Sequence, residues 1–276
     1  MFIIMRGFLF LFSLLTLSGF HDGEPDIPVI PDQLDSVIVK SYIAGKSTPV
    51  ANSNIPRLEL RRSTPSASLP QALSLQPSVV STSEGGTGLG YTQLRVRGVG
   101  GYQTNVTLNG ITLNDAESQE VFWVNIPGLS GMLGSVQLQR GLGTSSSGPG
   151  AFGASVNMNS APAGDAYERD EFSYGSYNTR VLMLSGATGL SPHGFYAETA
   201  YTRQKTDGYM ENAKADVRTY YGVYGWMNAA NSLRFVFIRG KQKSGITWNG
   251  VPLAMYEVNR RYNSSPGDTD NYRQVQ

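Results

Sequence analysis

Hydrophobic and polar residues alternate in the second part of the chain with the period of two that is typical of β-strands. The alternation is clearest in residues 195–205 and 233–243, where one face is apolar and the other is mixed. The alternation is weaker in residues 179–186 and 217–227, where neighbouring hydrophobic residues make it unclear which side chains share a face. We predict about five antiparallel strands, at residues 168–174, 179–186, 195–205, 217–227 and 233–243.

The connections between these strands alternate in length. Residues 187–194 and 228–232 form short links, whereas residues 206–216 form a longer one and the segment after residue 244 is longer still. Strands of about ten residues, with short turns at one end and long loops at the other, are typical of outer-membrane barrels. A five-stranded soluble sheet is the alternative.

Residues 45–163 have a different pattern, with many glycines and short elements, and predict a small α+β domain. Ser68 is a candidate N-cap for a short helix that Pro77 ends. Asn109 and Gly110 lie between two apolar runs and predict a type I′ hairpin. Short strands are expected at residues 93–97, 105–108, 111–113, 135–139 and 154–159, and the stretch from residue 42 to Arg62 is expected to be irregular.

The N-terminus carries the features of a secretory signal. Residues 1–20 hold one early charge, Arg6, followed by an apolar run of residues 7–17 that is too short to span a bilayer as a helix. A short buried helix is the alternative. The proline-rich, acidic residues 21–33 are interpreted as a linker. Beyond the signal no apolar run has the length of a membrane-spanning helix, so any membrane-spanning part is expected to consist of strands.

Composition removes several function classes. Charged residues make up 16% of the 276 residues, below the roughly 25% of soluble domains, while hydrophobic residues reach 40%. A net charge of +1 without a Lys/Arg cluster argues against nucleic-acid binding. The absence of cysteine excludes disulfides, thiolate metal sites and a thiol nucleophile.

No motif supports an enzyme, a cofactor or a metal site. Residues 45–47 lack the leading glycine of a phosphate-binding loop, and residues 85–101 lack a dinucleotide fingerprint. Residues 153–157 begin like a nucleophile elbow but end in asparagine instead of glycine. The two histidines, His21 and His193, lie in a linker and a turn. We therefore expect no catalysis, no cofactor and no metal.

An ordered series of segments nevertheless resembles a known family. The segments are DSVIVKS (35–41), SLPQALSLQPSVV (68–80), LRVRGVGG (94–101), VTLNGITLND (106–115), VFWVNIPG (121–128), GSVQLQRGLGTSSSGPGAFGASVNMNS (134–160) and YGSYNTR (174–180). In this order they resemble the plug domain and first barrel strands of TonB-dependent outer-membrane receptors. The sequence of residues 113–123 is similar to receptors of the Bacteroidetes lineage.

The resemblance implies an α+β plug domain followed by antiparallel transmembrane β-barrel strands. The expected organisation is a signal peptide (1–20), a linker with a candidate TonB box (21–44), a plug (45–163) and the first part of the barrel (164–276). It further implies energised uptake of a scarce ligand, such as an iron–siderophore complex, haem, cobalamin or a glycan. A non-transporting receptor or signalling component with the same plug is the alternative.

The implied location is the outer membrane of a Gram-negative bacterium, with the plug facing the periplasm. The implied partners are TonB, energised by ExbB and ExbD, then outer-membrane lipid and a small-molecule or glycan ligand, with no nucleic acid. The candidate TonB box is Asp35, Ser36, Val37, Ile38 and Val39, which would pair with a TonB strand; the same run can be read as the first plug strand.

Other site residues follow from the same resemblance. Arg97 and Arg140 match arginines that lock the plug to barrel glutamates, the alternative being exposed strand ends. Residues 117–120 are a further candidate ligand-contacting loop. Candidate ligand contacts at the plug apex are Gly100, Gly101, Tyr102 and Gln103.

The strand count predicts a longer protein. Plugged outer-membrane transporters have about 22 strands, and about five cannot close a barrel around a plug. An open sheet would expose unpaired backbone groups to lipid. Residues 271–276 are interpreted as the start of a sixth strand, so we expect the chain to be an N-terminal fragment, with roughly 17 strands encoded downstream.

Overall fold

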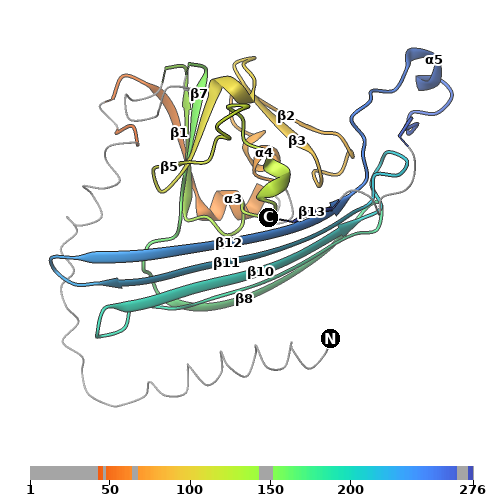
Figure 1. Ribbon diagram of the computed structural model, residues 1–276. Coiled ribbons are helices and arrows are strands. Elements are labelled where there is room, and N and C mark those ends of the chain that lie inside the picture. The colour runs from red at the N-terminus through yellow and green to blue at the C-terminus, as the bar shows by residue number, and fades with distance from the viewer. Residues whose placement is uncertain (1–42, 46–47, 64–67, 143–151, 266–272, 276) are drawn as a thin grey trace, which may run out of the picture.

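A mixed sheet of short strands stands over one face of a curved sheet of long strands (Figure 1). The computed structural model describes residues 43–45, 48–63, 68–142, 152–265 and 273–275. The expected signal, the linker and the candidate TonB box at residues 35–41 lie outside the described residues.

The mixed sheet has the strand order β1-β6-β7-β4-β5. β4 and β7 are parallel, and the other neighbours are antiparallel. β2 and β3 form a separate antiparallel hairpin. The strands are β1 (Ala51–Pro56), β2 (Val79–Ser83), β3 (Thr92–Val96), β4 (Thr104–Leu108), β5 (Ile111–Thr112), β6 (Ser135–Arg140) and β7 (Ala154–Asn159); the helices are α3 (Arg57–Ser63), α4 (Leu69–Leu73), η1 (Gly101–Gln103) and η2 (Trp123–Asn125).

The predicted elements of this part are confirmed in kind, with two exceptions. Asn109 and Gly110 have φ values of 50° and 83°, as the type I′ hairpin between β4 and β5 requires. The prediction that the stretch up to Arg62 is irregular is wrong, because it contains β1 and α3. β1 has one buried hydrophobic residue, Ile55, and its strand form comes from pairing along β6. β2, with its single buried Val79, was also not predicted.

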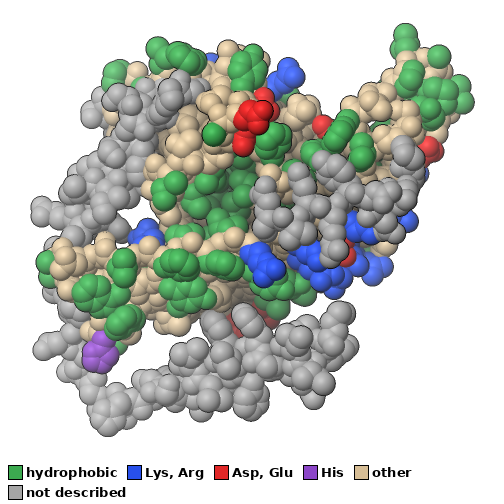
Figure 2. Space-filling view, in the orientation of Figure 1, with side chains coloured by type: hydrophobic (Ala, Val, Ile, Leu, Met, Phe, Trp, Pro, Cys, Tyr) green, Lys and Arg blue, Asp and Glu red, His purple; other side chains and the backbone are tan. Residues whose placement is uncertain are grey.

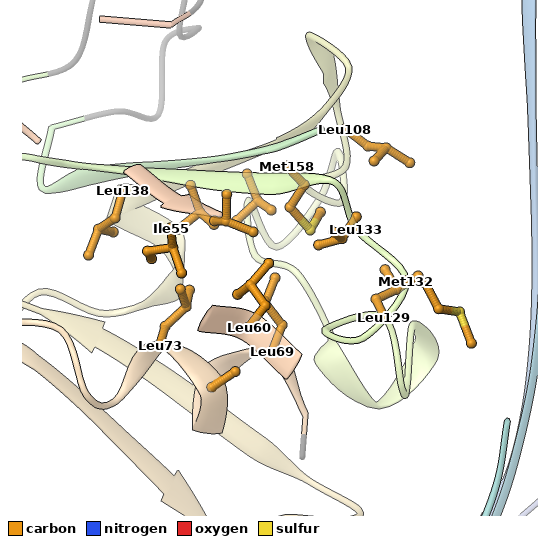
Figure 3. Packing of buried hydrophobic residues seen from close by; sticks show 14 of the residues in the cluster. Ile55, Leu60, Leu69, Leu73, Leu108, Leu129, Met132, Leu133, Leu138 and Met158 are labelled. Carbon is orange, nitrogen blue, oxygen red and sulfur yellow. The ribbon is translucent and has the colours of Figure 1, made fainter. Parts of the chain in front are cut away.

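The core lies under the mixed sheet, between its strands and the two short helices. Leu60 of α3 and Leu73 of α4 are fully buried and point toward the mixed sheet, on the side where Leu138 of β6 lies (Figure 3). Burying a leucine contributes roughly 1.5–3 kcal/mol. The same cluster includes Met183 and Tyr221 from the long sheet, so one core joins the two sheets.

The long sheet is antiparallel, with the order β13-β12-β11-β10-β9-β8. It confirms the five predicted strands, and β13 falls where a sixth was expected to start. A four-residue helix, α5, follows β12 and lies away from both sheets (Figure 1). The bounds are β8 (Ala166–Gly175), β9 (Thr179–Thr188), β10 (Phe195–Thr206), β11 (Ala215–Met227), β12 (Ser232–Ser244), α5 (Leu253–Tyr256) and β13 (Arg273–Val275).

Side chains of the long sheet alternate between a face toward the mixed sheet and a face away from it. In β10 the even-numbered residues from Tyr196 to Thr206 are buried, while the odd-numbered ones are partly or fully exposed. We call these the inner and outer faces. Among the described residues, no helix has the length and apolar character needed to cross a membrane.

Candidate functional site

A cavity of about 460 Å³ opens between loops of the mixed sheet, the β2–β3 hairpin and the segment after β12. Its wall combines aromatic side chains with two carboxylates and one guanidinium. The side chains that characterise it are Glu84, Tyr91, Arg95, Tyr102, Glu120, Phe122, Trp123 and Trp248.

The aromatic part of the wall has open ring surface. Tyr91 and Trp248 meet edge to face with their ring centroids 5.5 Å apart. Tyr102 and Trp248 are each more than half exposed. Exposed rings of this kind offer faces for stacking against a ligand.

The polar part of the wall holds unused hydrogen-bonding capacity. One carboxylate oxygen of Glu84 accepts a bond from the Gln93 amide at 3.5 Å, while its buried Oε2 has no donor among the described residues. The nearby Thr92 Oγ1 is likewise buried and unpaired there. Burial raises the pKa of Glu84 above its usual value. The cavity is therefore suited to a ligand that donates hydrogen bonds.

The structure brings most of the predicted ligand contacts to this cavity. Gly100, Gly101 and Tyr102 line it, and so does Glu120 from the second candidate loop. A Cβ on Gly101 would lie 3.2 Å from the Glu120 carboxyl carbon, so the glycine lets the flexible Glu120 side chain lie close to the backbone. Gln103 does not line the cavity; its carbonyl accepts a bond from the Gly153 N–H at 2.9 Å.

Sequence reasoning did not identify Glu84, Tyr91, Trp123 or Trp248 as cavity residues. Trp248 comes from a segment more than a hundred residues away from the others. The one available signal was an aromatic residue in the predicted long loop after β12. Such a loop position is exposed, and a tryptophan there is uncommon without a packing or binding role.

Arg97 and Arg140 lie close together where β6 ends, next to the β2–β3 hairpin. Arg97 follows β3 directly, in a turn with a φ of 53°, and is exposed. A Cβ on Gly141 would lie 3.3 Å from the Arg97 guanidinium. Arg140 donates to the Pro77 carbonyl and to Ser53 Oγ, both at 2.8 Å. Neither arginine forms an ion pair among the described residues.

The positive charges of Arg97 and Arg140 are held unfavourably close together at the end of β6. Partial burial, and secondarily the charge of Arg97, lower the pKa of Arg140. Two neighbouring guanidinium groups without a carboxylate repel each other. The arrangement is therefore suited to an acidic partner outside the described residues.

A different arginine joins the two sheets. Arg57, at the start of α3, pairs with Glu198 on the inner face of β10, and its Nη1 lies 3.4 Å from Oε2. The Tyr167 hydroxyl donates to the same carboxylate at 2.9 Å. The Arg57 and Arg61 guanidiniums lie 5.5 and 5.7 Å from the centre of the Tyr167 ring. This cluster was not predicted.

A short loop also packs directly on the inner face. Thr219 Oγ1 of β11 donates to the Pro127 carbonyl at 2.7 Å. Gly128 has a φ of +69°, and a Cβ there would lie 2.9 Å from Thr202 Oγ1. Gly240 of β12 lies against Pro127, since its Cβ would come within 3.0 Å of the proline ring. Glycine on both sides thus permits close contact between loop and sheet.

Comparison with known proteins supports this architecture. Residues 44–155 match the family model of the TonB-dependent Receptor Plug Domain. No curated protein matches the sequence.

Among solved structures, the chain is similar to the ferric yersiniabactin uptake receptor FyuA from Yersinia pestis, with a TM-score of 0.60 and 15% identity over 82% of this chain and 36% of that one. It is similar to the copper transporter OprC, with a TM-score of 0.60 and 16% identity over 72% of this chain and 32% of that one. For the pyoverdine outer membrane receptor FpvA from Pseudomonas aeruginosa PAO1 the TM-score is 0.58, with 16% identity over 75% of this chain and 30% of that one.

The chain thus spans about a third of the length of these structures. At such identities the likeness concerns the fold. The mixed sheet with its helices corresponds to a plug and the long sheet to a barrel wall. The fold is that of a TonB-dependent receptor plug domain followed by antiparallel barrel strands.

Proposed function

We propose that the protein is a TonB-dependent transporter of a Gram-negative outer membrane that takes up a scarce ligand, with the plug facing the periplasm. The observation that carries the proposal is the cavity shared by plug loops and Trp248 of the segment after β12. A ligand bound there contacts the plug and an outer loop together, so its occupancy is coupled to plug position. The amino-acid sequence of residues 113–123 supports an origin in the Bacteroidetes lineage.

Energy for transport is proposed to enter through residues 35–41. This run pairs by β-augmentation with a strand of TonB, which ExbB and ExbD energise. Force on it reaches β1 first and then Arg57, because these follow it in the chain. The Arg57–Glu198 pair is the first side-chain link to the wall along that path.

The lining of the cavity is suited to a ligand with flat apolar faces and several hydrogen-bond donors. Ring surfaces of Tyr102 and Trp248 provide stacking, and Glu84 and Thr92 provide acceptors. Siderophores, haem, cobalamin and glycans all remain within that description. The alternative function, a receptor that signals occupancy without transport, uses the same cavity.

The test measures binding and uptake separately in the full-length protein. Tryptophan fluorescence is titrated with a ferric hydroxamate siderophore, haemin, cyanocobalamin and maltoheptaose. The ligand that binds should quench wild type, and Trp248→Phe and Glu84→Gln should weaken its binding about tenfold. An exposed control away from the cavity, Glu168→Gln on β8, should leave it unchanged.

Uptake of the same ligand by cells should stop when TonB is removed. Saturable binding with unchanged accumulation in cells lacking this protein would favour the signalling alternative. Binding unaffected by Trp248→Phe and Glu84→Gln would exclude the cavity as the site.

A further inference from the structure

The outer face of the long sheet carries basic side chains at the ends of its strands next to the β10–β11 connection. Strand register places them in two adjacent rows across the sheet, which we call the basic rows. The first row is Phe172, Leu182, Arg203, Arg218 and Lys241, and the second is Tyr174, Arg180, Lys205, Asp216 and Lys243.

The first row sets three cations directly opposite one another. Arg203 pairs in register with Arg218, which pairs in register with Lys241. Like charges at directly opposed positions destabilise a sheet. An arrangement that costs stability in the free protein is explained by an anionic partner that offsets the repulsion.

One carboxylate serves the cations of both rows among the described residues. Asp216 lies 3.1 Å from Lys205, 3.6 Å from Arg203 and 3.7 Å from Arg218. The Nε of Arg203 is shielded from water and has no hydrogen-bond acceptor there. The basic rows therefore hold six cations and one acid.

The rest of the same face is apolar and aromatic. Phe195, Leu233 and Phe235 lie at the opposite ends of the strands and are 59–70% exposed. Tyr201 and Tyr220 lie between that region and the basic rows, with their rings tilted against each other and the ring centroids 4.8 Å apart. Figure 2 shows hydrophobic side chains over one end of the long strands and Lys and Arg over the other.

The spacing agrees with one membrane thickness. The ten-residue step from Phe195 to Lys205 covers about 33 Å at roughly 3.3 Å per residue, or about 25 Å of depth at a strand tilt of about 40°. Aromatic residues gather where hydrocarbon meets the polar interface. Tyr201 and Tyr220 thus mark that boundary and the basic rows lie at headgroup level.

A hollow is present at the same place. It has a volume of about 370 Å³, and its charged lining consists of four cations, Arg180, Lys205, Lys214 and Lys243, and two carboxylates, Asp207 and Asp216. Ammonium and guanidinium groups around a hollow match phosphate oxygens, which accept several charge-assisted hydrogen bonds at once.

We propose that the basic rows bind the phosphate-bearing headgroup of a lipid in the surrounding membrane leaflet. The partner is a lipid because the cations continue an apolar outer face whose exposed side chains would contact its acyl chains. This inference rests on the proposed outer-membrane location, and it adds a specific anionic lipid site outside the ligand cavity.

The test uses the full-length protein in detergent and native mass spectrometry with diphosphoryl lipid A as the probe. Wild type should retain the lipid, and R203Q/R218Q/K241Q should bind it about a hundredfold more weakly, since each basic side chain at a membrane surface contributes roughly fivefold. The charge-preserving variant R203K/R218K/K241R should keep most of the affinity. Salt at about 1 M should release the lipid from wild type.

Four outcomes would overturn the proposal. In the first, R203Q/R218Q/K241Q binds diphosphoryl lipid A as tightly as wild type does, and in the second, wild type binds dephosphorylated lipid A equally tightly. In the third, millimolar inorganic phosphate displaces the lipid. In the fourth, wild type binds soluble poly-glutamate more tightly than the lipid. If R203Q/R218Q/K241Q fails to fold, the salt and dephosphorylation measurements on wild type decide the question. Insertion of wild type into phosphatidylcholine vesicles is scored in parallel: failure to insert contradicts the proposed function, whereas insertion without lipid A binding contradicts this inference alone.

Discussion

Arg57 of the plug and Glu198 of the barrel wall form a two-pronged ion pair across the interface between the two sheets. Glu198 is only 5% exposed, and its carboxylate also accepts a hydrogen bond from the Tyr167 hydroxyl. Arg57 additionally donates to the Met132 carbonyl at 3.2 Å. Burial lowers the pKa of Arg57, and the paired carboxylate is what keeps a charge acceptable at this position.

Glu198→Gln should loosen the plug from the wall. Removing one partner of a buried ion pair costs about 3–5 kcal/mol, because the other charge is left without compensation. Limited proteolysis of the full-length protein should then cleave the plug faster than in wild type. Replacing both partners, as in R57M/E198M, should cost less than Glu198→Gln alone. The control Glu168→Gln, on the outer face, should match wild type, and equal cleavage of Glu198→Gln would contradict a linking role.

Arg97 and Arg140 should lock the plug through acidic partners outside the described residues. The two cations lie close together, and among the described residues neither forms an ion pair. If they have no acidic partner, replacing both with alanine only removes their mutual repulsion. If they have one, the same change removes the lock. With a lock, R97A/R140A should increase leakage of large antibiotics through the full-length protein. Unaltered antibiotic sensitivity and unaltered uptake would identify them as ordinary exposed strand ends.

Val37→Pro should uncouple the protein from TonB. Proline removes a backbone N–H and cannot continue a paired strand. Uptake of the ligand should fall to the level of cells without TonB, while ligand binding by the purified protein stays unchanged. Asp26→Pro, within the proline-rich linker, is the matched control and should transport normally. Wild-type uptake by the Val37→Pro variant would contradict the assignment of residues 35–41.

The sequence predicts the wall strands well because their alternation is set by two different surroundings. In residues 195–205, side chains on one face pack toward the plug and those on the other face are exposed. Burial therefore alternates from one position to the next. The hairpin at Asn109 and Gly110 is predictable for a local reason, since few residues accept positive φ at both central positions.

The parts that were missed depend on contacts distant in the chain. β1 carries a single buried hydrophobic residue, Ile55, so its strand form follows from β6 and not from its own pattern. Arg57 and Glu198 are 141 positions apart, and only the packing of the plug against the long sheet brings them together. Trp248 joins the cavity for the same kind of reason. Charge or aromatic character alone does not indicate such partners.

Gly153→Ala should destabilise the plug. A Cβ at this position would lie 2.1 Å from a methyl group of Val99 and 3.1 Å from the Gln103 carbonyl, which is already bound by the Gly153 N–H. Backbone on one side leaves little room to adjust, and overpacking of this kind costs about 1–3 kcal/mol. Thermal unfolding of the full-length protein should occur at a lower temperature. Gly175→Ala, where a Cβ meets nothing within 4 Å, should leave the transition in place.

Glu84→Gln should stabilise the protein at neutral pH and have no effect in acid. Burial raises the pKa of the Glu84 carboxyl in the folded state. Below the ordinary value both folded and unfolded chains hold the proton, so Glu84 does not influence stability there. As the pH rises past that value the unfolded chain ionises first, and the folded state loses stability until the pH exceeds its own higher pKa. The resulting penalty is below about 1 kcal/mol because Glu84 remains partly solvated.

The measurement is the thermal transition of full-length wild type, Glu84→Gln and the exposed control Glu117→Gln at pH 4 and pH 7.5. Glu84→Gln should unfold at a higher temperature than wild type at pH 7.5, and the difference should disappear at pH 4. A gain that is the same at both pH values would point to improved packing instead of a relieved charge. A loss at pH 7.5 would show that the ionised carboxylate is held by a donor, and it would remove Glu84 Oε2 from the acceptors offered to a ligand.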